Sequence, residues 1–191
     1  MTVVFQAGAF GGNDTGNGGQ TNRYLFTPST GGLDQVRVTF TAPNATFGMQ
    51  TDHCSIGIDD GSNTGSVTAT PIELKFGGVS GFNIAAGATA VSDWTNFTWT
   101  AGQLLIAIWD MNAASQGWSD FSKPATTGTA GQLWFKGSTA SWNVQTVSGY
   151  GGPATGLIYG VTTVEIQSLG PTVDGSVGGQ IFRMRQPGWR W

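Results

Sequence analysis

Three residues carry the side chains of a serine hydrolase triad: Ser92, Asp93 and His53. A triad needs a serine nucleophile, an imidazole base and an acid that orients the imidazole. His53 is the single histidine of the chain, and Ser92 and Asp93 lie together in the stretch AVSDW. The alternative is that Ser92 and Asp93 cap a turn by binding nearby backbone N–H groups, while His53 faces outward at the start of a strand. We favour the turn, because the sequence supplies no groups to orient a triad.

The stretch around this turn, GFNIAAGATAVSDWTNFTW (residues 81–99), resembles the small β-sandwich domain that often precedes the catalytic domain of GDSL-type (SGNH) esterases. In that domain a strand runs into a P-x-G-x-x-x-x-SD turn, and the matching residues here are Ala86, Gly87, Ser92 and Asp93. The resemblance extends by strand spacing over residues 35–167. It also covers stand-alone sandwich proteins of bacteriophages and prophages, and so implies a sandwich without its esterase.

The catalytic parts of such an esterase are missing from the sequence. The family's Gly-Asp-Ser motif does not occur, since 60–62 holds Asp, Gly and Ser in a different order. No Asp stands three residues before His53, so the family's Asp-x-x-His pair is also missing. We therefore expect a protein that is not an enzyme and that needs no cofactor.

A turn rich in oxygen ligands, DDGSN at residues 59–63, is a weak candidate for calcium. Asp59, Asp60 and Asn63 supply hard oxygens, and Asp52 lies nearby in the sequence. The stretch lacks the twelfth-position Glu of an EF-hand, and the same residues are ordinary turn formers. We favour the turn and expect no bound metal. One His and one Cys also make zinc a poor fit.

Eight tryptophans raise the possibility of a carbohydrate platform, because aromatic rings beside short polar groups can stack on sugars. The candidate platform residues, which fall in loops or on the outward phase of strands, are Trp94, Trp109, Trp118, Asp93 and Asp120, with Asp110 and Asn112 beside them. The alternative is that these rings pack under loops or against a neighbour, and that Trp99, Trp134 and Trp142 belong to the core.

The C-terminal segment IFRMRQPGWRW, residues 181–191, has the composition of an interface. Arg and Trp are enriched at interface hot spots, and large apolar groups are costly to leave in water. We expect this segment to dock on another subunit through Ile181, Arg183, Met184, Arg185, Trp189, Arg190 and Trp191. The Gly-rich stretch GPTVDGSVGGQ, residues 170–180, would be its flexible linker.

The elements that must position these groups are strands. Apolar and polar residues alternate in QVRVTFTA (35–42), with Val36, Val38 and Phe40 on one face. Similar short runs, separated by turn residues, occur at 53–59, 72–76, 82–84, 96–99, 104–109, 133–136, 141–144 and 157–166. We find no convincing amphipathic helix. About nine or ten strands at this spacing predict an all-β, jelly-roll-like antiparallel sandwich.

One run contains a change of phase. In LIYGVTTVEI, Leu157, Tyr159 and Val161 alternate, and Val164 and Ile166 then continue one step out of register. A one-residue slip would turn the second half to the other face of the sheet. We therefore predict a β-bulge near Thr162 and Thr163.

Composition and charge limit the remaining classes of function. Residues 1–174 hold all 11 acids and five bases, a net charge of −6, whereas 175–191 hold three Arg and no acid. An acidic body argues against nucleic-acid binding. One cysteine, Cys54, excludes an internal disulfide. No run approaches the roughly 18 apolar residues of a membrane span, and MTVVFQAGAFGG has no signal-peptide pattern.

Together these observations predict three parts: a Gly-rich N-terminal arm (1–22), a β-sandwich (23–169) and a C-terminal linker with its docking arm (170–191). The expected function is a non-enzymatic bacteriophage virion protein, made in the host cytoplasm, either a capsid decoration protein or a tail or fibre adhesion component. Its partners would be copies of itself or other virion proteins, with a cell-surface glycan as a further possibility. A carbohydrate-binding module is the alternative, and an esterase fragment the third.

Overall fold

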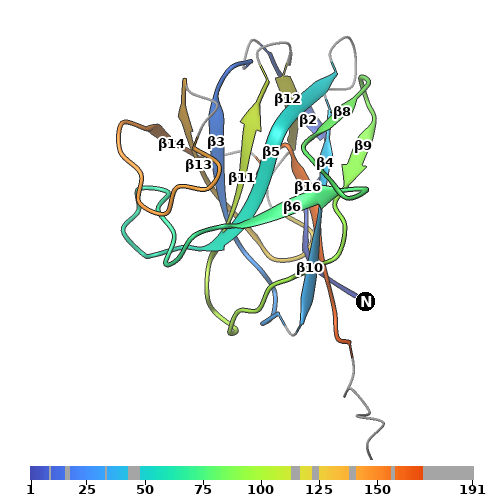
Figure 1. Ribbon diagram of the computed structural model, residues 1–191, viewed down its shortest axis with the longest axis vertical. Helices are drawn as coiled ribbons and strands as arrows, with labels where there is room; N and C mark the ends of the chain where they lie inside the picture. The colour runs from blue at the N-terminus through green and yellow to red at the C-terminus, as the bar shows by residue number, and fades with distance from the viewer. Residues whose placement is uncertain are drawn as a thin grey trace, which may run out of the picture.

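The computed structural model describes residues 1–8, 10–15, 18–32, 34–42, 48–112, 117–121, 125–137, 141–155 and 158–169. These residues form sixteen strands and no helix, and every strand pair among them is antiparallel. Two sheets pack against each other to make a sandwich (Figure 1). The predicted all-β sandwich is confirmed. Within the described part of the chain, no helix is available to cross a membrane.

The first sheet has five strands in the order β1-β16-β4-β10, with β9 also paired to β4. Its strands are β1 (Thr2–Gln6), β4 (Gln35–Thr41), β9 (Thr89–Val91), β10 (Thr95–Asn96) and β16 (Val161–Gln167).

The second sheet has eight strands in the order β14-β13-β3-β11-β5-β6-β7, with β8 also paired to β5. Its strands are β3 (Thr21–Thr27), β5 (Met49–Ile58), β6 (Ile72–Phe76), β7 (Val79–Ser80), β8 (Phe82–Ile84), β11 (Leu105–Met111), β13 (Thr129–Lys136) and β14 (Gly151–Thr155). A small third sheet joins β2 (Phe10–Thr15), β12 (Gly117–Phe121) and β15 (Ile158–Tyr159).

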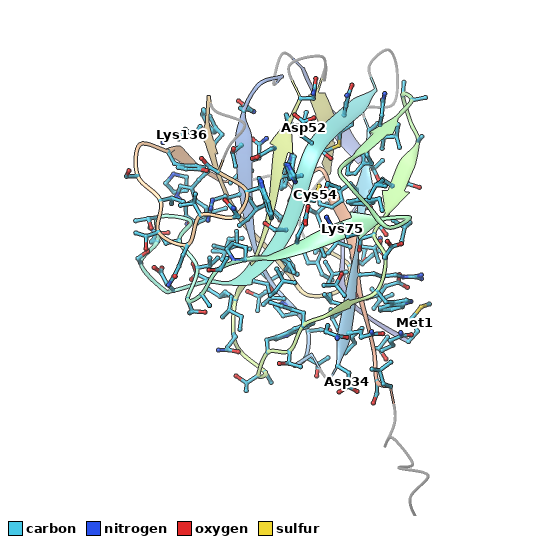
Figure 2. All side chains as sticks on the ribbon, in the orientation of Figure 1. Met1, Asp34, Asp52, Cys54, Lys75 and Lys136 are labelled. Atoms are coloured by element: carbon cyan, nitrogen blue, oxygen red, sulfur yellow. The ribbon has the colours of Figure 1, made fainter. Side chains whose placement is uncertain are left out.

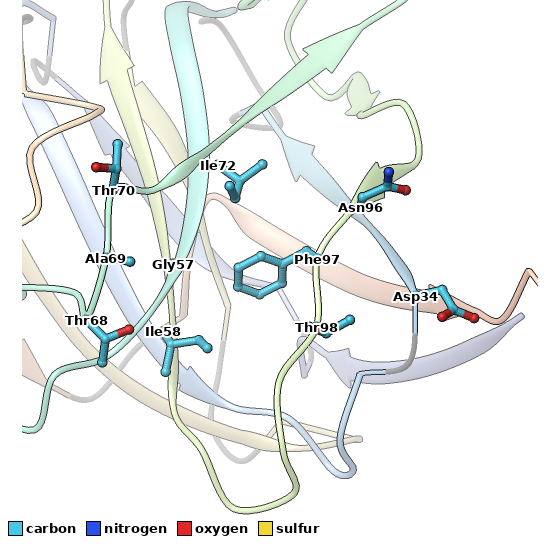
Figure 3. A pocket seen from close by; sticks show the side chains of 10 residues that line it. All are labelled: Asp34, Gly57, Ile58, Thr68, Ala69, Thr70, Ile72, Asn96, Phe97 and Thr98. Atoms are coloured by element: carbon cyan, nitrogen blue, oxygen red, sulfur yellow. The ribbon is translucent and has the colours of Figure 1, made fainter.

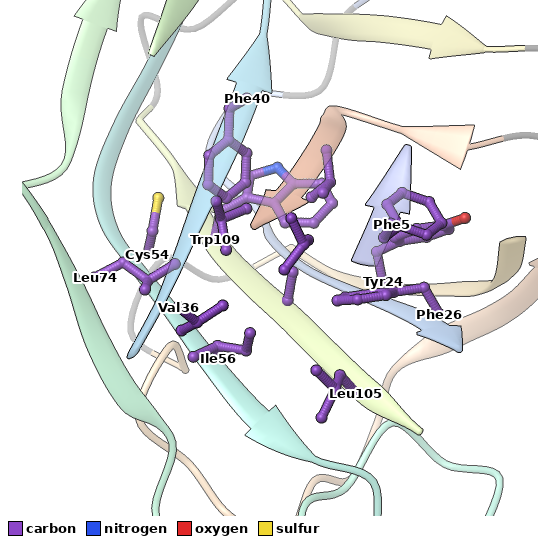
Figure 4. Packing of buried hydrophobic residues seen from close by; sticks show 14 of the residues in the cluster. Phe5, Tyr24, Phe26, Val36, Phe40, Cys54, Ile56, Leu74, Leu105 and Trp109 are labelled. Carbon is purple, nitrogen blue, oxygen red and sulfur yellow. The ribbon is translucent and has the colours of Figure 1, made fainter. Parts of the chain in front are cut away.

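The core fills the space between the two large sheets (Figure 4). Val36, Val38 and Phe40 of β4 are fully buried, as their alternation predicts. Phe40 meets Trp109 of β11 edge-on, with ring centroids 5.8 Å apart. Burial of these large apolar groups is the main term that stabilises the sandwich.

The predicted β-bulge in the last strong strand run is confirmed. The pairing of β16 with β4 shifts register between Val161 and Thr163, so Val161 and Val164 both stay buried. Gly160, just before β16, has φ +66°, a conformation that residues with a side chain rarely adopt. The extra residue keeps the apolar groups of both halves on the core face.

The expectation of an N-terminal arm over residues 1–22 is wrong for the described residues of that range. Thr2–Gln6 forms β1 and pairs with β16, and Phe10–Thr15 forms β2 and pairs with β12. Val4 and Phe5 are both fully buried, because the pairing of β1 shifts register between Val3 and Phe5. Glycine can supply backbone hydrogen bonds to a ladder, so a Gly-rich composition did not prevent β2 from forming.

The eight-stranded sheet is buried on both faces at its centre. Leu105, Ala107 and Trp109 face the space between the sheets, whereas Ile106 and Ile108 lie in a separate apolar cluster on the other face. Leu25 of β3 and two loop residues, Val67 and Trp142, complete that second cluster. The sheet is therefore covered on its outer face by residues of the 59–71 and 141–150 segments.

Two strand predictions at the end of this sheet need correction. Residues 141–144 form a turn of the covering loop rather than a strand. In the run 133–136, strand alternation places Phe135 on the same buried face as Leu133, yet Phe135 is 42% exposed while Leu133 and Trp134 are buried. Phe135 lies on β13, next to the edge strand β14, and a five-stranded sheet is too narrow to cover every strand of an eight-stranded one.

Candidate functional site

The three triad candidates have structural partners. Ser92 is buried, and its Oγ accepts a hydrogen bond from the Val38 N–H at 2.9 Å. The two carboxylate oxygens of Asp93 accept hydrogen bonds from the backbone N–H groups of Gly77 and Gly78. Both residues thus have structural roles, although the N–H groups they bind lie on β4 and in the Gly77–Gly78 turn rather than in their own turn.

His53 lies in a different set of contacts. Its Nδ1 is 3.1 Å from Glu73 Oε1, and its ring stacks on Trp142 with centroids 4.5 Å apart. Burial tends to raise the pKa of Glu73, but hydrogen bonds from Lys75, Ser80 and His53 outweigh that effect and lower it. Glu73 is therefore a carboxylate that orients the imidazole, but the serine of the predicted triad bonds elsewhere.

The predicted tryptophan platform is not assembled as expected. Trp109 is fully buried in the core, so its assignment to a sugar site is wrong. Trp94 is half-buried, and the Arg37 guanidinium lies over its ring at 4.7 Å. Arg37 also pairs with Glu165, with Nε and Oε2 2.5 Å apart. Trp118 and Asp120 lie on β12, and their side chains are outside the described part of the structure.

The DDGSN turn is held by its own hydrogen bonds. Asp59 Oδ2 accepts from the Gly61 N–H and Asp60 Oδ1 from the Ser62 N–H, and Asn63 takes a positive φ of 57°. Burial raises the pKa of Asp59. Among the described residues, no group of three or more His, Cys, Asp or Glu side chains is placed to hold a metal ion.

Cys54 lies in the centre of the body on β5 (Figure 2). It is fully buried, and burial raises the pKa of its thiol well above the usual range. Because the thiolate is the reactive form, we expect a thiol reagent to label Cys54 on the order of a hundredfold more slowly in the native protein than in urea. Equal labelling rates in the two conditions would show that Cys54 is not buried.

Among the described residues, a buried arginine is the centre of an extensive polar site. Arg23 of β3 is fully buried on the outer face of the eight-stranded sheet. Its Nη1 donates to the Gly65 carbonyl at 2.8 Å, and its Nη2 donates to the carbonyls of Ser141 and Val144 at 2.9 and 2.5 Å. The guanidinium also lies 5.5 Å from the centre of the Tyr150 ring. One side chain therefore fastens both covering loops.

Asp110 extends this polar site along the next row of the sheet. It is fully buried and accepts a hydrogen bond from Thr21 Oγ1 at 2.5 Å, and it lies opposite His53 in the β11–β5 pairing. Burial raises the pKa of Asp110 to about 6, although the Thr21 hydrogen bond, the nearby His53, the Trp142 backbone and Arg23 all act to lower it. Burial also lowers the pKa of Arg23. In the sequence Arg23 gave no signal, and Asp110 was expected only beside a surface platform, whereas it is buried.

A pocket of about 380 Å³ opens where the edges of the two large sheets meet (Figure 3). We call it the edge pocket. Its apolar lining comes from Ile58 and Ile72 of the eight-stranded sheet and from Phe97, which follows β10 of the other sheet. Figure 3 shows the Phe97 ring pointing toward the two isoleucines. Asp34 and Asn96 add polar groups at its side.

A second, smaller pocket of about 260 Å³ combines aromatic and polar groups. Trp134 and Tyr150 line it together with Asn63, Thr64 and Ser148. It lies beside the Arg23 site, because Arg23 contacts the Tyr150 ring and pairs with Trp134 across β3 and β13. This pocket has the mixture of rings and short polar groups that was expected around other tryptophans.

The predicted docking segment, residues 181–191, lies outside the described residues, so its contacts remain a prediction. The residues from which the C-terminal segment continues are described. The last described residues, Ser168 and Leu169, are held by Asp34, whose Oδ2 accepts from Ser168 Oγ and from the Leu169 N–H, both at 2.9 Å. Asp34 also lines the edge pocket.

Comparison with protein-family models and with curated proteins finds no match for this chain.

Proposed function

We propose that this chain is a non-enzymatic structural protein of a bacteriophage virion, either a capsid decoration protein or a tail or fibre component. The observation that carries the proposal is the use of Ser92, Asp93 and His53 in structural contacts, which leaves the sandwich without its most obvious hydrolytic residues. The resemblance of residues 35–167 to stand-alone phage sandwich domains supports the same class.

The edge pocket and the acidic body favour a role in assembly. Ile72 in the pocket is 43% exposed, and Leu169 beside Asp34 is 60% exposed. A pocket with an exposed apolar wall is a candidate interaction surface. An assembly protein would cover such a surface against other copies or other virion proteins.

The direct test is the protein content of the particle. Particles released from a lysing culture that carries this gene would be purified on a density gradient and analysed by mass spectrometry. The proposal expects the chain in the particle fraction at a fixed ratio to the major capsid or tail protein. Abundant chain in the lysate with none in the particles would overturn the proposal.

A second test separates structural from catalytic use of Ser92. Substituting Ser92→Ala leaves the buried Val38 N–H without its acceptor, which should lower the free energy of unfolding by about 1–3 kcal/mol. The purified wild-type protein should turn over no nitrophenyl ester. Denaturant unfolding and an esterase assay measure the two effects, and ester turnover that Ser92→Ala abolishes would contradict the proposal.

Carbohydrate binding is the second candidate, and the second pocket is the observation that favours it. Trp134 and Tyr150 offer rings, and Asn63 and Ser148 offer hydrogen-bonding groups, within one concave site. A glycan array would test it, with Asn63→Ala as the variant expected to lose binding and Trp94→Ala as the matched control. Loss of binding in Trp94→Ala alone would instead place the glycan at the originally predicted platform.

A further inference from the structure

We propose that the edge pocket receives residues 181–191 of a second copy of this chain. This inference rests on the proposed assembly function and names the contact through which copies join. It follows from three features: the apolar chemistry of the pocket, the point where the described chain ends, and the length and charge of the segment beyond it.

The pocket is built to hold a large apolar side chain. Ile58, Ile72 and Phe97 form its walls, with the aliphatic parts of Thr68, Ala69 and Thr70 along one side. The Phe97 ring packs against the Trp99 ring, with centroids 5.7 Å apart. This contact fixes the position of the Phe97 wall. Water in such a site finds few hydrogen-bond partners on the apolar walls. An apolar ring that displaces this water buries its own apolar surface and that of the pocket, which favours binding.

The segment beyond residue 169 carries the matching chemistry. Trp189 and Trp191 flank Arg190, and Ile181 and Met184 precede them. Asp34 lies at the pocket, and the two described hydrogen bonds of its carboxylate both use Oδ2. An arginine beside a docked ring would find the Asp34 carboxylate there, and the body's net charge of −6 (five bases, 11 acids) attracts a segment with three arginines over a longer range.

The length of the linker favours a neighbouring copy over the segment's own body. Asp34 binds Leu169 and lines the pocket, so a segment docking on its own body would need only a short connection. The 11 residues 170–180 can span about 36–40 Å when extended. A globular domain of this size has a radius of gyration of about 15 Å, and hence a width of about 40 Å. The extended linker is therefore long enough to reach the same pocket on an adjacent copy.

Disulfide trapping between two differently labelled chains tests the inference. One variant carries Ile72→Cys in the pocket, and the other carries Arg190→Cys, which keeps both tryptophans. The native Cys54 is fully buried and does not compete. Under mild oxidation of the mixture we expect a mixed disulfide, at a yield on the order of tenfold above that of a control pair with Val79→Cys. Val79 is 62% exposed and lies on β7, outside the pocket lining.

Other outcomes overturn the inference in distinguishable ways. If the mixture gives no mixed disulfide but the double variant Ile72→Cys/Arg190→Cys forms one within a single chain, the segment docks on its own body. If neither forms, or if the Val79→Cys control reacts as well, the pocket does not receive this segment.

A mass measurement on the full chain makes the test independent of oxidation. Ile72→Asp places a charge in the pocket mouth, and Val79→Asp places the same charge on a matched exposed strand residue. We expect Ile72→Asp to remain monomeric at concentrations where the wild type and Val79→Asp associate. The dissociation constant for self-association should rise at least tenfold in Ile72→Asp. Equal association of all three would overturn the inference. Failure of the virion proposal would be seen separately, as absence of the chain from purified particles.

Discussion

Replacing Arg23 with Ala is expected to lower the free energy of unfolding by about 3–5 kcal/mol, the largest effect of any single substitution considered for this protein. The substitution removes the donors to three loop carbonyls, those of Gly65, Ser141 and Val144. Each carbonyl that stays buried without a donor costs on the order of 1–3 kcal/mol, and the lost side chain leaves a void between the sheet and its covering loops.

The effect should be local before it is global. The 141–150 loop is attached by Arg23, by Ser55 Oγ donating to the Trp142 carbonyl at 2.6 Å, and by the backbone bond from Val67 to Gln145. Loss of Arg23 removes the central attachment, so limited proteolysis should cut this loop in the variant sooner than in the wild type.

Arg37→Ala is the matched control. Like Arg23, Arg37 has a ring contact, and it adds an ion pair with Glu165, but its side chain is 28% exposed on the outer face of the five-stranded sheet. A partly exposed pair of this kind contributes roughly 1 kcal/mol or less. Urea denaturation of both variants measures the difference. Equal losses of unfolding free energy in Arg23→Ala and Arg37→Ala would show that the buried hydrogen bonds of Arg23 stabilise the protein no more than a surface ion pair does.

The sequence predicted the class of fold because its signal is local. Alternation in residues 35–42 identified β4 and its buried face, and the phase change after Tyr159 identified the bulge in β16. These features depend only on which neighbours along one strand are apolar.

Features that depend on what covers a sheet were not predictable in the same way. LLIAIW was interpreted as half-buried, with Trp109 outward, but loops cover the outer face and both phases of β11 are buried. A continuous apolar run is typical of a strand buried on both faces, and that signal was present in the sequence. Arg23 gave no such signal, because an arginine on the outward phase of a strand has the same pattern whether loops cover it or not.

The edge pocket could not be predicted from the sequence either. Its main residues, Asp34, Ile58, Ile72 and Phe97, come from four separate segments and meet only because the edges of two sheets are adjacent. Strand order sets that adjacency, and strand order is a property of long-range pairing rather than of local pattern. Sequence reasoning correctly gave Ser92 and Asp93 a structural role, but their partners, Val38 on β4 and the Gly77–Gly78 turn, are distant in the sequence and could not be named from it.

Asp110 should make the protein less stable as the pH rises from about 4 to about 7. Burial raises the folded-state pKa of Asp110 from the ordinary 3.8 to about 6. The folded state therefore binds a proton more tightly than the unfolded state does, and protonation of Asp110 favours folding. Its contribution is fully present below about pH 4 and is lost as the pH rises through about 6. A shift of this size corresponds to roughly 2–3 kcal/mol.

Asp110→Asn isolates this contribution, because the amide keeps an oxygen that can accept from Thr21 but carries no titratable proton. Glu73 acts in the opposite direction: its lowered pKa stabilises the folded state above its ordinary pKa, and that stabilisation is lost as the pH falls. Glu73 is present in both proteins, so it cancels in the difference between them. Urea unfolding at several pH values should therefore give a wild-type minus Asp110→Asn difference that falls by roughly 2–3 kcal/mol between pH 4 and pH 7. A difference that stays constant over this range would mean that Asp110 is ionised in the folded protein at all these pH values, held so by His53 and Arg23.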